Sequence, residues 1–116
     1  MSYFPLRDRI ESIIARCGIS RGLVTIHARG ATPAIIVVDR RELEYFDELL
    51  KKLVPVTGWR HGNAYAHLRS TITSTTTTVP FINSRLVLPL EYEVYFLETR
   101  PVHNHRRIVH IYIRGI

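Results

Sequence analysis

The chain has 116 residues, of which 46% are hydrophobic and 22% are charged, and this length predicts a single domain over residues 1–116. Its net charge of +6 favours anionic partners such as phosphate esters or nucleic acid, without choosing between them. The longest apolar runs fall far short of the ~20 residues of a membrane span, so no membrane partner is expected.

The single cysteine, Cys17, rules out an intramolecular disulfide, and we expect it to be a small buried residue of an apolar helix. Charged residues from Arg7 to Glu11 interrupt the only early apolar run, so no signal peptide is expected. Together these features predict a protein of the reducing cytoplasm.

The first third of the chain predicts one helix and two strands. Apolar residues recur at helical spacing over 6–17, and Gly18 follows as a typical helix stop. Two runs rich in β-branched residues come next, at 22–28 and 34–38. The second run is apolar on both faces, which predicts a strand covered on both sides.

The middle of the chain predicts one long and one short helix. Asp39 and Glu42 have the spacing of a capping box, which predicts a helix that starts there and ends at Val54. Asn63 is a suitable cap for a short helix over 64–70. We expect two side chains of this short helix to turn inward, His67 and Leu68.

The last part of the chain predicts strands. Residues 71–79 are mostly threonine and are β-branched except at Ser74, which predicts a strand, and Pro80 is expected to end this strand or to place it at a sheet edge. Three more strands are predicted at 85–88, 92–99 and 106–114. The final one is apolar on both faces, which predicts cover by a partner subunit. Helices and strands do not alternate strictly, so the predicted class is α+β.

Three blocks of the sequence resemble the YjbQ family. They are GLVTIHARGATPAIIVVD at 22–39, NAYAHL at 63–68, and the stretch from that motif to Pro80, continued by 85–88 and the strand that ends at Glu98. The resemblance implies a compact α+β subunit with a β-sandwich, two main helices and one short, partly buried helix, assembled as a homotrimer. It also implies a secondary thiamine-phosphate synthase, which joins a pyrimidine diphosphate to a thiazole phosphate.

The resemblance implies an active site of three histidines and a nearby acid. This chain has Gly30 in place of the first histidine and Tyr65 in place of the second, so only His67 of the set is present. It also has PLEY at 89–92, where the family has Gly-Thr-Trp-Gln. We therefore expect a degenerate active site.

A catalytic zinc ion takes three protein ligands, and one imidazole alone cannot hold it. His61 lies six residues before His67 and is the candidate second ligand. The cofactor thus remains unknown, and a divalent metal is not favoured.

The candidate catalytic residues are His67, Asn63 and Glu98. The alternative for His67 is a hydrogen-bonded, partly buried histidine with a structural role. Burial would raise the pKa of Glu98 and suit it to proton transfer, whereas an ion pair with Arg100 or Arg106 would make it structural.

Binding of a phosphorylated or anionic small molecule depends least on the missing histidines. The candidate ligand-binding residues flank the matched motifs: Arg60, Arg69, Ser70, Thr32 and Tyr65. Arginine binds phosphate through a rigid fork, and the start of the helix after Asn63 would add backbone N–H donors. Tyr65 either blocks the pocket or offers it a hydroxyl.

Two alternatives remain. The first is a nucleic-acid-binding protein, in which the basic cluster over 100–107 binds phosphates while Tyr92, Tyr95 and Tyr112 stack on bases. The second is a catalytically inactive trimer with a structural role.

Overall fold

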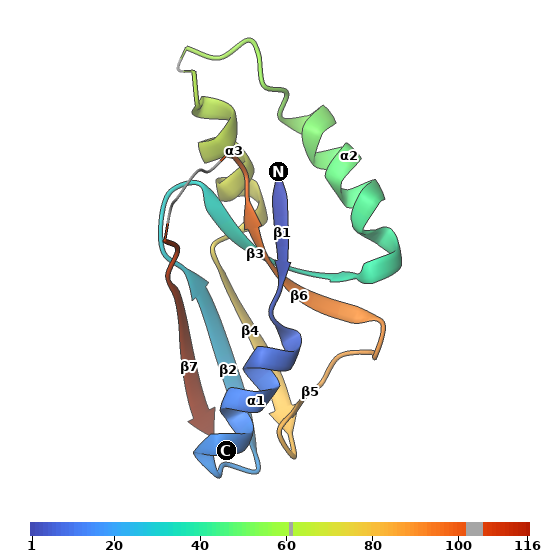
Figure 1. Cartoon of the computed structure of the whole chain (residues 1–116), viewed down its shortest axis with the longest axis vertical. Coiled ribbons are helices and arrows are strands. Elements are labelled where there is room, and N and C mark those ends of the chain that lie inside the picture. The colour runs from blue at the N-terminus through green and yellow to red at the C-terminus, as the bar shows by residue number, and fades with distance from the viewer. Residues whose placement is uncertain (61, 102–105) are drawn as a thin grey trace.

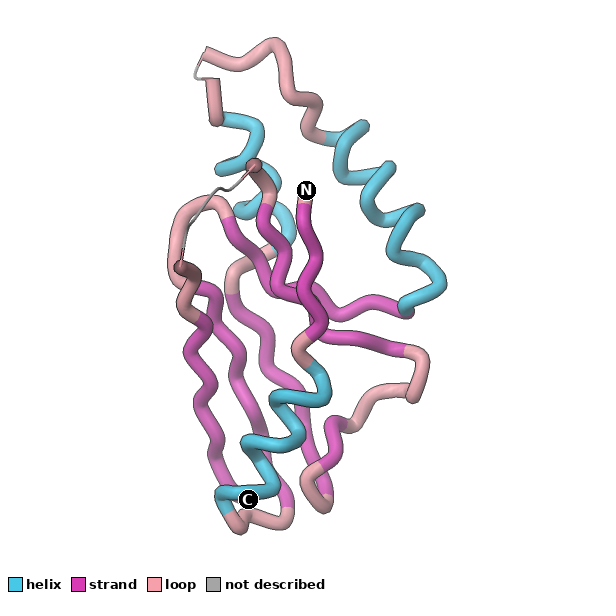
Figure 2. The backbone as a smooth tube through the Cα atoms, in the orientation of Figure 1, coloured by secondary structure: helices cyan, strands magenta, loops and turns pink. Residues whose placement is uncertain are grey.

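The computed structural model describes residues 1–60, 62–101 and 106–116 (Figure 1). Over these residues the chain forms three α-helices and two antiparallel sheets, and the predicted α+β class is confirmed (Figure 2). The elements in chain order are β1 (Ser2–Pro5), α1 (Arg7–Cys17), β2 (Arg21–Ala28), β3 (Pro33–Asp39), the 3-10 helix η1 (Arg40–Glu42), α2 (Leu43–Leu53), α3 (Ala64–Thr73), β4 (Thr76–Ile82), β5 (Arg85–Leu86), β6 (Tyr92–Glu98) and β7 (Val109–Gly115). None of the described helices could span a membrane.

The larger sheet has the strand order β5-β4-β2-β7, and the smaller has the order β1-β6-β3. One apolar core joins both sheets to α1. Ile10 and Ile14 of α1 are fully buried there against Val24 and Ile26 of β2 and Phe96 of β6. Helix α1 ends at Gly18, whose φ of 70° is left-handed, as the sequence predicts.

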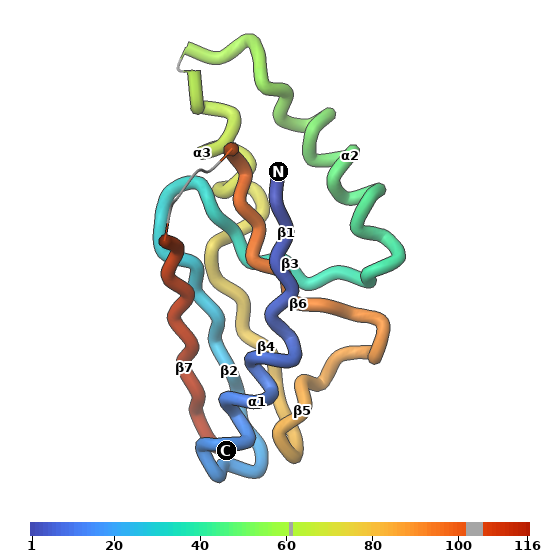
Figure 3. The backbone as a smooth tube through the Cα atoms, viewed as in Figure 1, coloured from blue at the N-terminus to red at the C-terminus, as the bar shows by residue number. Residues whose placement is uncertain are grey.

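A second, smaller core covers the other side of β3. Ile36 packs there against Leu50 of α2, whereas Ile35 belongs to the core beneath α1. Burial of both faces of β3 confirms the prediction made from its continuous apolar run. The segment after α2 leads to α3 at the end of the molecule opposite the C-terminus (Figure 3).

Asp39 caps a helix, as predicted, but the capped turn is η1, which leads into α2. Its carboxylate accepts a hydrogen bond from the Arg41 backbone N–H, at 2.9 Å, and also binds the Arg41 guanidinium. The hydrogen bond from the Arg41 side chain is the main reason that the pKa of Asp39 falls to about 2. The carboxylate of Asp39 therefore has a structural role.

The predicted strand over 71–79 is wrong in its first half, because α3 continues to Thr73. Thr71 and Thr73 donate their hydroxyls to backbone carbonyls four residues back, at 2.9 and 2.6 Å, which satisfies polar groups within the helix. Ser74, with φ of 78°, ends α3, and β4 begins at Thr76.

Other element boundaries also differ from the predictions. Strand β1 was not predicted, since four residues containing a proline give little pattern; it pairs with β6. Pro80 lies inside β4, opposite Leu23, and the lost N–H is tolerated because the neighbour β5 has only two residues. The last strand begins at Val109. Cys17 is exposed at the end of α1, contrary to the predicted burial.

Candidate functional site

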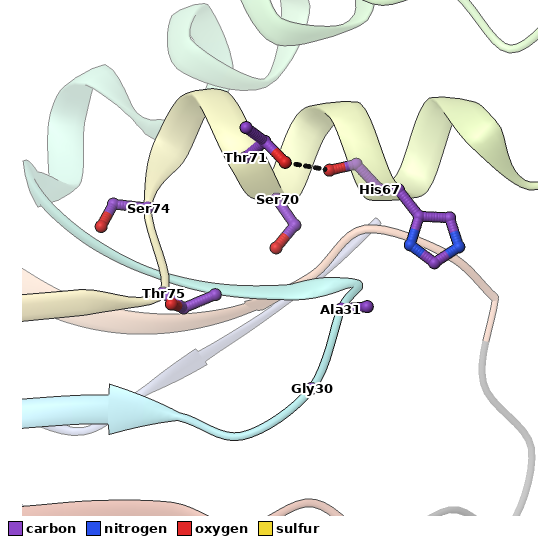
Figure 4. A pocket seen from close by; sticks show the side chains of 7 residues that line it. All are labelled: Gly30, Ala31, His67, Ser70, Thr71, Ser74 and Thr75. Carbon is purple, nitrogen blue, oxygen red and sulfur yellow. Dashed lines mark hydrogen bonds between the residues drawn. The ribbon is translucent and has the colours of Figure 1, made fainter.

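A cavity of about 370 Å³ lies between α3 and the loop that joins β2 to β3 (Figure 4). This size falls within the range of small-molecule sites. Its lining residues are Gly30, Ala31, His67, Ser70, Thr71, Ser74 and Thr75. We refer to it as the His67 cavity.

Buried hydroxyl groups fasten α3 to this loop. Ser70 Oγ donates to the carbonyl of Pro33, the first residue of β3, at 2.6 Å. Thr99 Oγ1 lies within hydrogen-bond distance of two carbonyls, those of Thr32 in the loop and Ala66 in α3, at 2.5 and 2.9 Å. Both hydroxyl residues are almost fully buried. These buried hydrogen bonds therefore fix the position of α3 relative to the loop, on the side of the helix that lines the cavity.

The structure corrects the predicted orientation of His67 and Leu68, since both are exposed. Helix α3 buries Ala66, Arg69 and Ser70 instead. The His67 ring extends from the outer side of α3 on the side of the β2–β3 loop (Figure 4). The histidine is thus available to a molecule in the cavity.

Tyr65 and Arg69 line a different cavity, of about 390 Å³, on another side of α3. The Arg69 guanidinium lies over the Tyr65 ring, 5.0 Å from its centroid, and Arg69 Nε donates to the Val54 carbonyl at 2.9 Å. The structure thus separates these two predicted ligand-binding residues from His67. Arg69 is buried and fastens α3 to the end of α2.

Asn63 and Arg60 are exposed and do not line the His67 cavity. Asn63 occupies the N-cap position of α3, as predicted, but its side chain makes no capping hydrogen bond. The cavity lies beside the middle and the end of α3, so the N-terminal N–H groups of the helix do not line it.

Glu98, at the end of β6, and Thr32, the last residue of the β2–β3 loop, are both buried and are joined by Arg107. The Arg107 guanidinium forms an ion pair with Glu98, and its Nη2 donates to Thr32 Oγ1 at 3.1 Å. The expected partners of Glu98, Arg100 and Arg106, are therefore replaced by Arg107. The sequence pattern gave no signal for this residue beyond its membership of the basic cluster.

A catalytic metal does not fit the described donor set. The His67 cavity contains one imidazole, and no three His, Cys, Asp or Glu side chains converge anywhere in residues 1–60, 62–101 and 106–116. The predicted second ligand, His61, lies outside the described residues. A zinc site with three protein ligands is not formed by this set.

The stacking surface expected of a nucleic-acid-binding protein is only partly present. Tyr95 is buried in the core beneath α2, whereas Tyr112 is exposed on β7. Of the basic cluster, Arg107 is held by Glu98, and His103 and His105 lie outside the described part of the chain.

Comparison with known proteins establishes the family of this chain. The family profile described as "UPF0047 protein YjbQ-like" matches residues 2–115. The chain belongs to the YjbQ family. Among relatives, it is 26% identical to the UPF0047 protein sll1880 of Synechocystis, covering 98% of this chain and 84% of that protein. A UPF0047 protein of Archaeoglobus fulgidus is 34% identical over 80% of this chain and 77% of its own length.

The fold is also that of solved YjbQ-like structures. A protein of unknown function from Sulfolobus solfataricus, SSO2532, superposes with a TM-score of 0.88 at 24% identity, covering 99% of this chain and 88% of that one. The two positions at which this chain lacks the expected histidines, Gly30 and Tyr65, line different cavities. Gly30 lines the His67 cavity, whereas Tyr65 lines the cavity of Arg69.

Proposed function

We propose that this YjbQ-family protein binds a small phosphorylated or otherwise anionic molecule in the His67 cavity. The cavity has the size of a small-molecule site, and none of its described lining residues is acidic. An anion would therefore meet no repelling carboxylate at the wall. The juxtaposition of His67 with the Gly30 loop carries the proposal.

The hydrogen bonds around the cavity constrain the ligand further. The hydroxyls of Ser70 and Thr71 donate their hydrogens to backbone carbonyls, so toward a ligand they can only accept. His67 and Thr75 are the lining side chains that can donate. A molecule that carries hydroxyl or amino donors beside its anionic group fits this arrangement best.

We further propose binding without the thiamine-phosphate synthase activity that the family resemblance implies. The motif calls for three imidazoles, and this cavity has one. Without the other two imidazoles, the cavity lacks groups that could transfer protons or bind a metal. Binding a phosphate needs only hydrogen-bond donors and positive charge. An inactive trimer with a structural role is the alternative.

Assembly as a homotrimer in the cytoplasm, with each subunit built as a β-sandwich, is part of this proposal. Its support is an apolar stripe on the outer side of α2, where the exposed fractions of Tyr45, Leu49 and Leu53 are 69, 54 and 61%. Apolar side chains at this helical spacing favour burial against another subunit.

The decisive experiment supplies the purified protein with the pyrimidine diphosphate and the thiazole phosphate, with and without a divalent metal. We expect saturable binding of at least one phosphorylated compound and no thiamine phosphate. Turnover that disappears in His67→Ala would overturn binding without catalysis. Absence of binding to every phosphorylated compound would overturn the proposed ligand class.

A further inference from the structure

Arg107 is fixed by two buried groups at the base of the β2–β3 loop. Its guanidinium pairs with the carboxylate of Glu98, of which only 3% of the side chain is exposed. The Nη2 of the same guanidinium donates to Thr32 Oγ1 at 3.1 Å, and Thr32 is itself 5% exposed. These contacts hold one edge of the guanidinium in place.

The other terminal nitrogen, Nη1, faces the loop that walls the His67 cavity. A Cβ added to Gly30 would lie 3.5 Å from Arg107 Nη1, so Gly30 and this nitrogen are direct neighbours. Gly30 has no side chain to separate them, and it is one of the lining residues of the cavity. Arg107 is not itself a lining residue of the cavity, so a ligand would meet the cation next to Gly30, where no side chain separates the two.

The chemistry of arginine suits such a position. The planar guanidinium has five N–H donors in a fixed fork, so binding Glu98 and Thr32 on one side leaves donors on the other. A carboxylate that holds an arginine in one rotamer reduces the entropy lost when that arginine binds an oxyanion. Lysine, with a compact ammonium on a flexible stem, would not keep both contacts.

We propose that Arg107 determines the specificity of the His67 cavity for an oxyanion, and that a phosphate group binds against Gly30 within reach of Arg107 Nη1. Glu98 and Thr32 are positioning residues that orient the guanidinium. This inference rests on the proposed binding of a phosphorylated ligand, and it adds the group that selects the phosphate. A glycine at position 30 is part of the arrangement, since a side chain there would cover the guanidinium.

The test uses inorganic phosphate as the probe and the His67 imidazole resonances as the reporter, in an NMR titration of the full-length protein. Arg107→Met should weaken phosphate binding at least about tenfold, as expected for the loss of a charged hydrogen bond. Arg106→Met, the same change at the exposed neighbouring arginine, is the matched control and should stay within about twofold of the wild type, as expected of an exposed charge.

Because Arg107→Met leaves Glu98 buried without its partner, the double variant Glu98→Gln/Arg107→Met is titrated as well. It removes both charges, so it should fold and still bind phosphate at least about tenfold more weakly than the wild type. Thr32→Val should weaken binding, and Thr32→Ser, which keeps the hydroxyl, should restore it, a recovery that a purely steric role would not give.

The outcomes separate the two proposals. A wild-type His67 signal that responds to phosphate, together with equal affinity in the folded double variant, would overturn the role of Arg107 and leave ligand binding intact. Equal weakening by Arg106→Met would also overturn it, because it would indicate general attraction to positive charge. If the His67 resonances of the wild-type protein do not change on addition of phosphate, both the proposed ligand binding and the role of Arg107 are wrong.

Discussion

Arg107 and Glu98 form an ion pair in which 3% of the carboxylate side chain and 24% of the arginine side chain are exposed to solvent. The pair joins the end of β6 to the residues just before β7. Buried pairs of this kind are costly to break on one side only, because the remaining charge is left in a poorly solvated place. The same pair points the guanidinium at the loop of the candidate site.

Replacing Glu98 with glutamine should therefore destabilise the fold. We expect the free energy of unfolding to decrease by about 3 kcal/mol. This is the lower end of the usual cost of breaking a buried pair, because Arg107 is partly exposed and can recover some hydration. Urea unfolding followed by circular dichroism measures this. Glu91→Gln, at an exposed carboxylate before β6, is the control; equal losses in both variants would contradict the importance of the pair.

Ser70→Ala should loosen the attachment of α3 to β3. The variant leaves the Pro33 carbonyl without its buried donor, which costs about 1–3 kcal/mol of stability. Thr71→Ala removes an exposed hydroxyl from the next position of the same helix and should have a small effect. Thermal denaturation of both variants makes the comparison, and a larger loss for Thr71→Ala would contradict the assignment.

Gly30→His, which introduces the histidine that the family resemblance implies at this position, should destabilise the protein. Gly30 has φ of 131°, a conformation that favours glycine, and a Cβ there would lie 3.0 Å from Pro33 Cδ. The strain should cost about 1–3 kcal/mol. Gly62→His is the matched control, because a Cβ at Gly62 meets nothing within 4 Å. Undiminished stability of Gly30→His in chemical denaturation would refute this explanation.

Stability at alkaline pH should depend on Tyr3. Burial, and then the hydrogen bond to Asp47, raise the pKa of its phenol above the ordinary value. A raised pKa in the folded state means that the stabilisation is complete below the unfolded pKa of about 10 and decreases as the pH rises further. Tyr3→Phe should therefore reduce the loss of stability above about pH 10, whereas Tyr112→Phe, at an exposed tyrosine of β7, should not. The measurement is the urea midpoint of each protein as a function of pH. Parallel curves for the wild type and Tyr3→Phe would contradict the prediction.

The proposed trimer predicts that a charge on the α2 stripe disrupts assembly. Leu49→Glu should shift the mass seen in sedimentation toward that of a monomer, because the carboxylate would have to be buried in the interface. Ser12→Glu, on the exposed side of α1, adds the same group elsewhere and should leave the mass unchanged. A wild-type protein that sediments as a monomer would refute the trimer itself.

Local pattern was enough to predict the parts of this fold that depend on single elements. The run over 34–38 was apolar on both faces and became β3, which packs against a core on each side. The threonine run after His67 could not be predicted in the same way. Its β-branched composition favours a strand, but hydroxyls that bond back to helix carbonyls, together with the burial of Ser70, extend α3 to Thr73.

The candidate site shows the same limit. The motif led to His67, yet helical geometry places Tyr65, two positions earlier, on another side of α3. Arg107 was out of reach of any pattern, because its contacts with Glu98 and Thr32 join segments 9 and 75 residues apart in the chain, and only folding brings them together.

The central claim is that a small anionic ligand binds in the His67 cavity, and an NMR titration of the wild-type protein with inorganic phosphate tests it most directly. We predict saturable shifts of His67, Ser70 and Thr75, and none at Tyr65 or Arg69. Shifts confined to Tyr65 and Arg69, or a gradual, unsaturated response scattered over the exposed arginines, would contradict it.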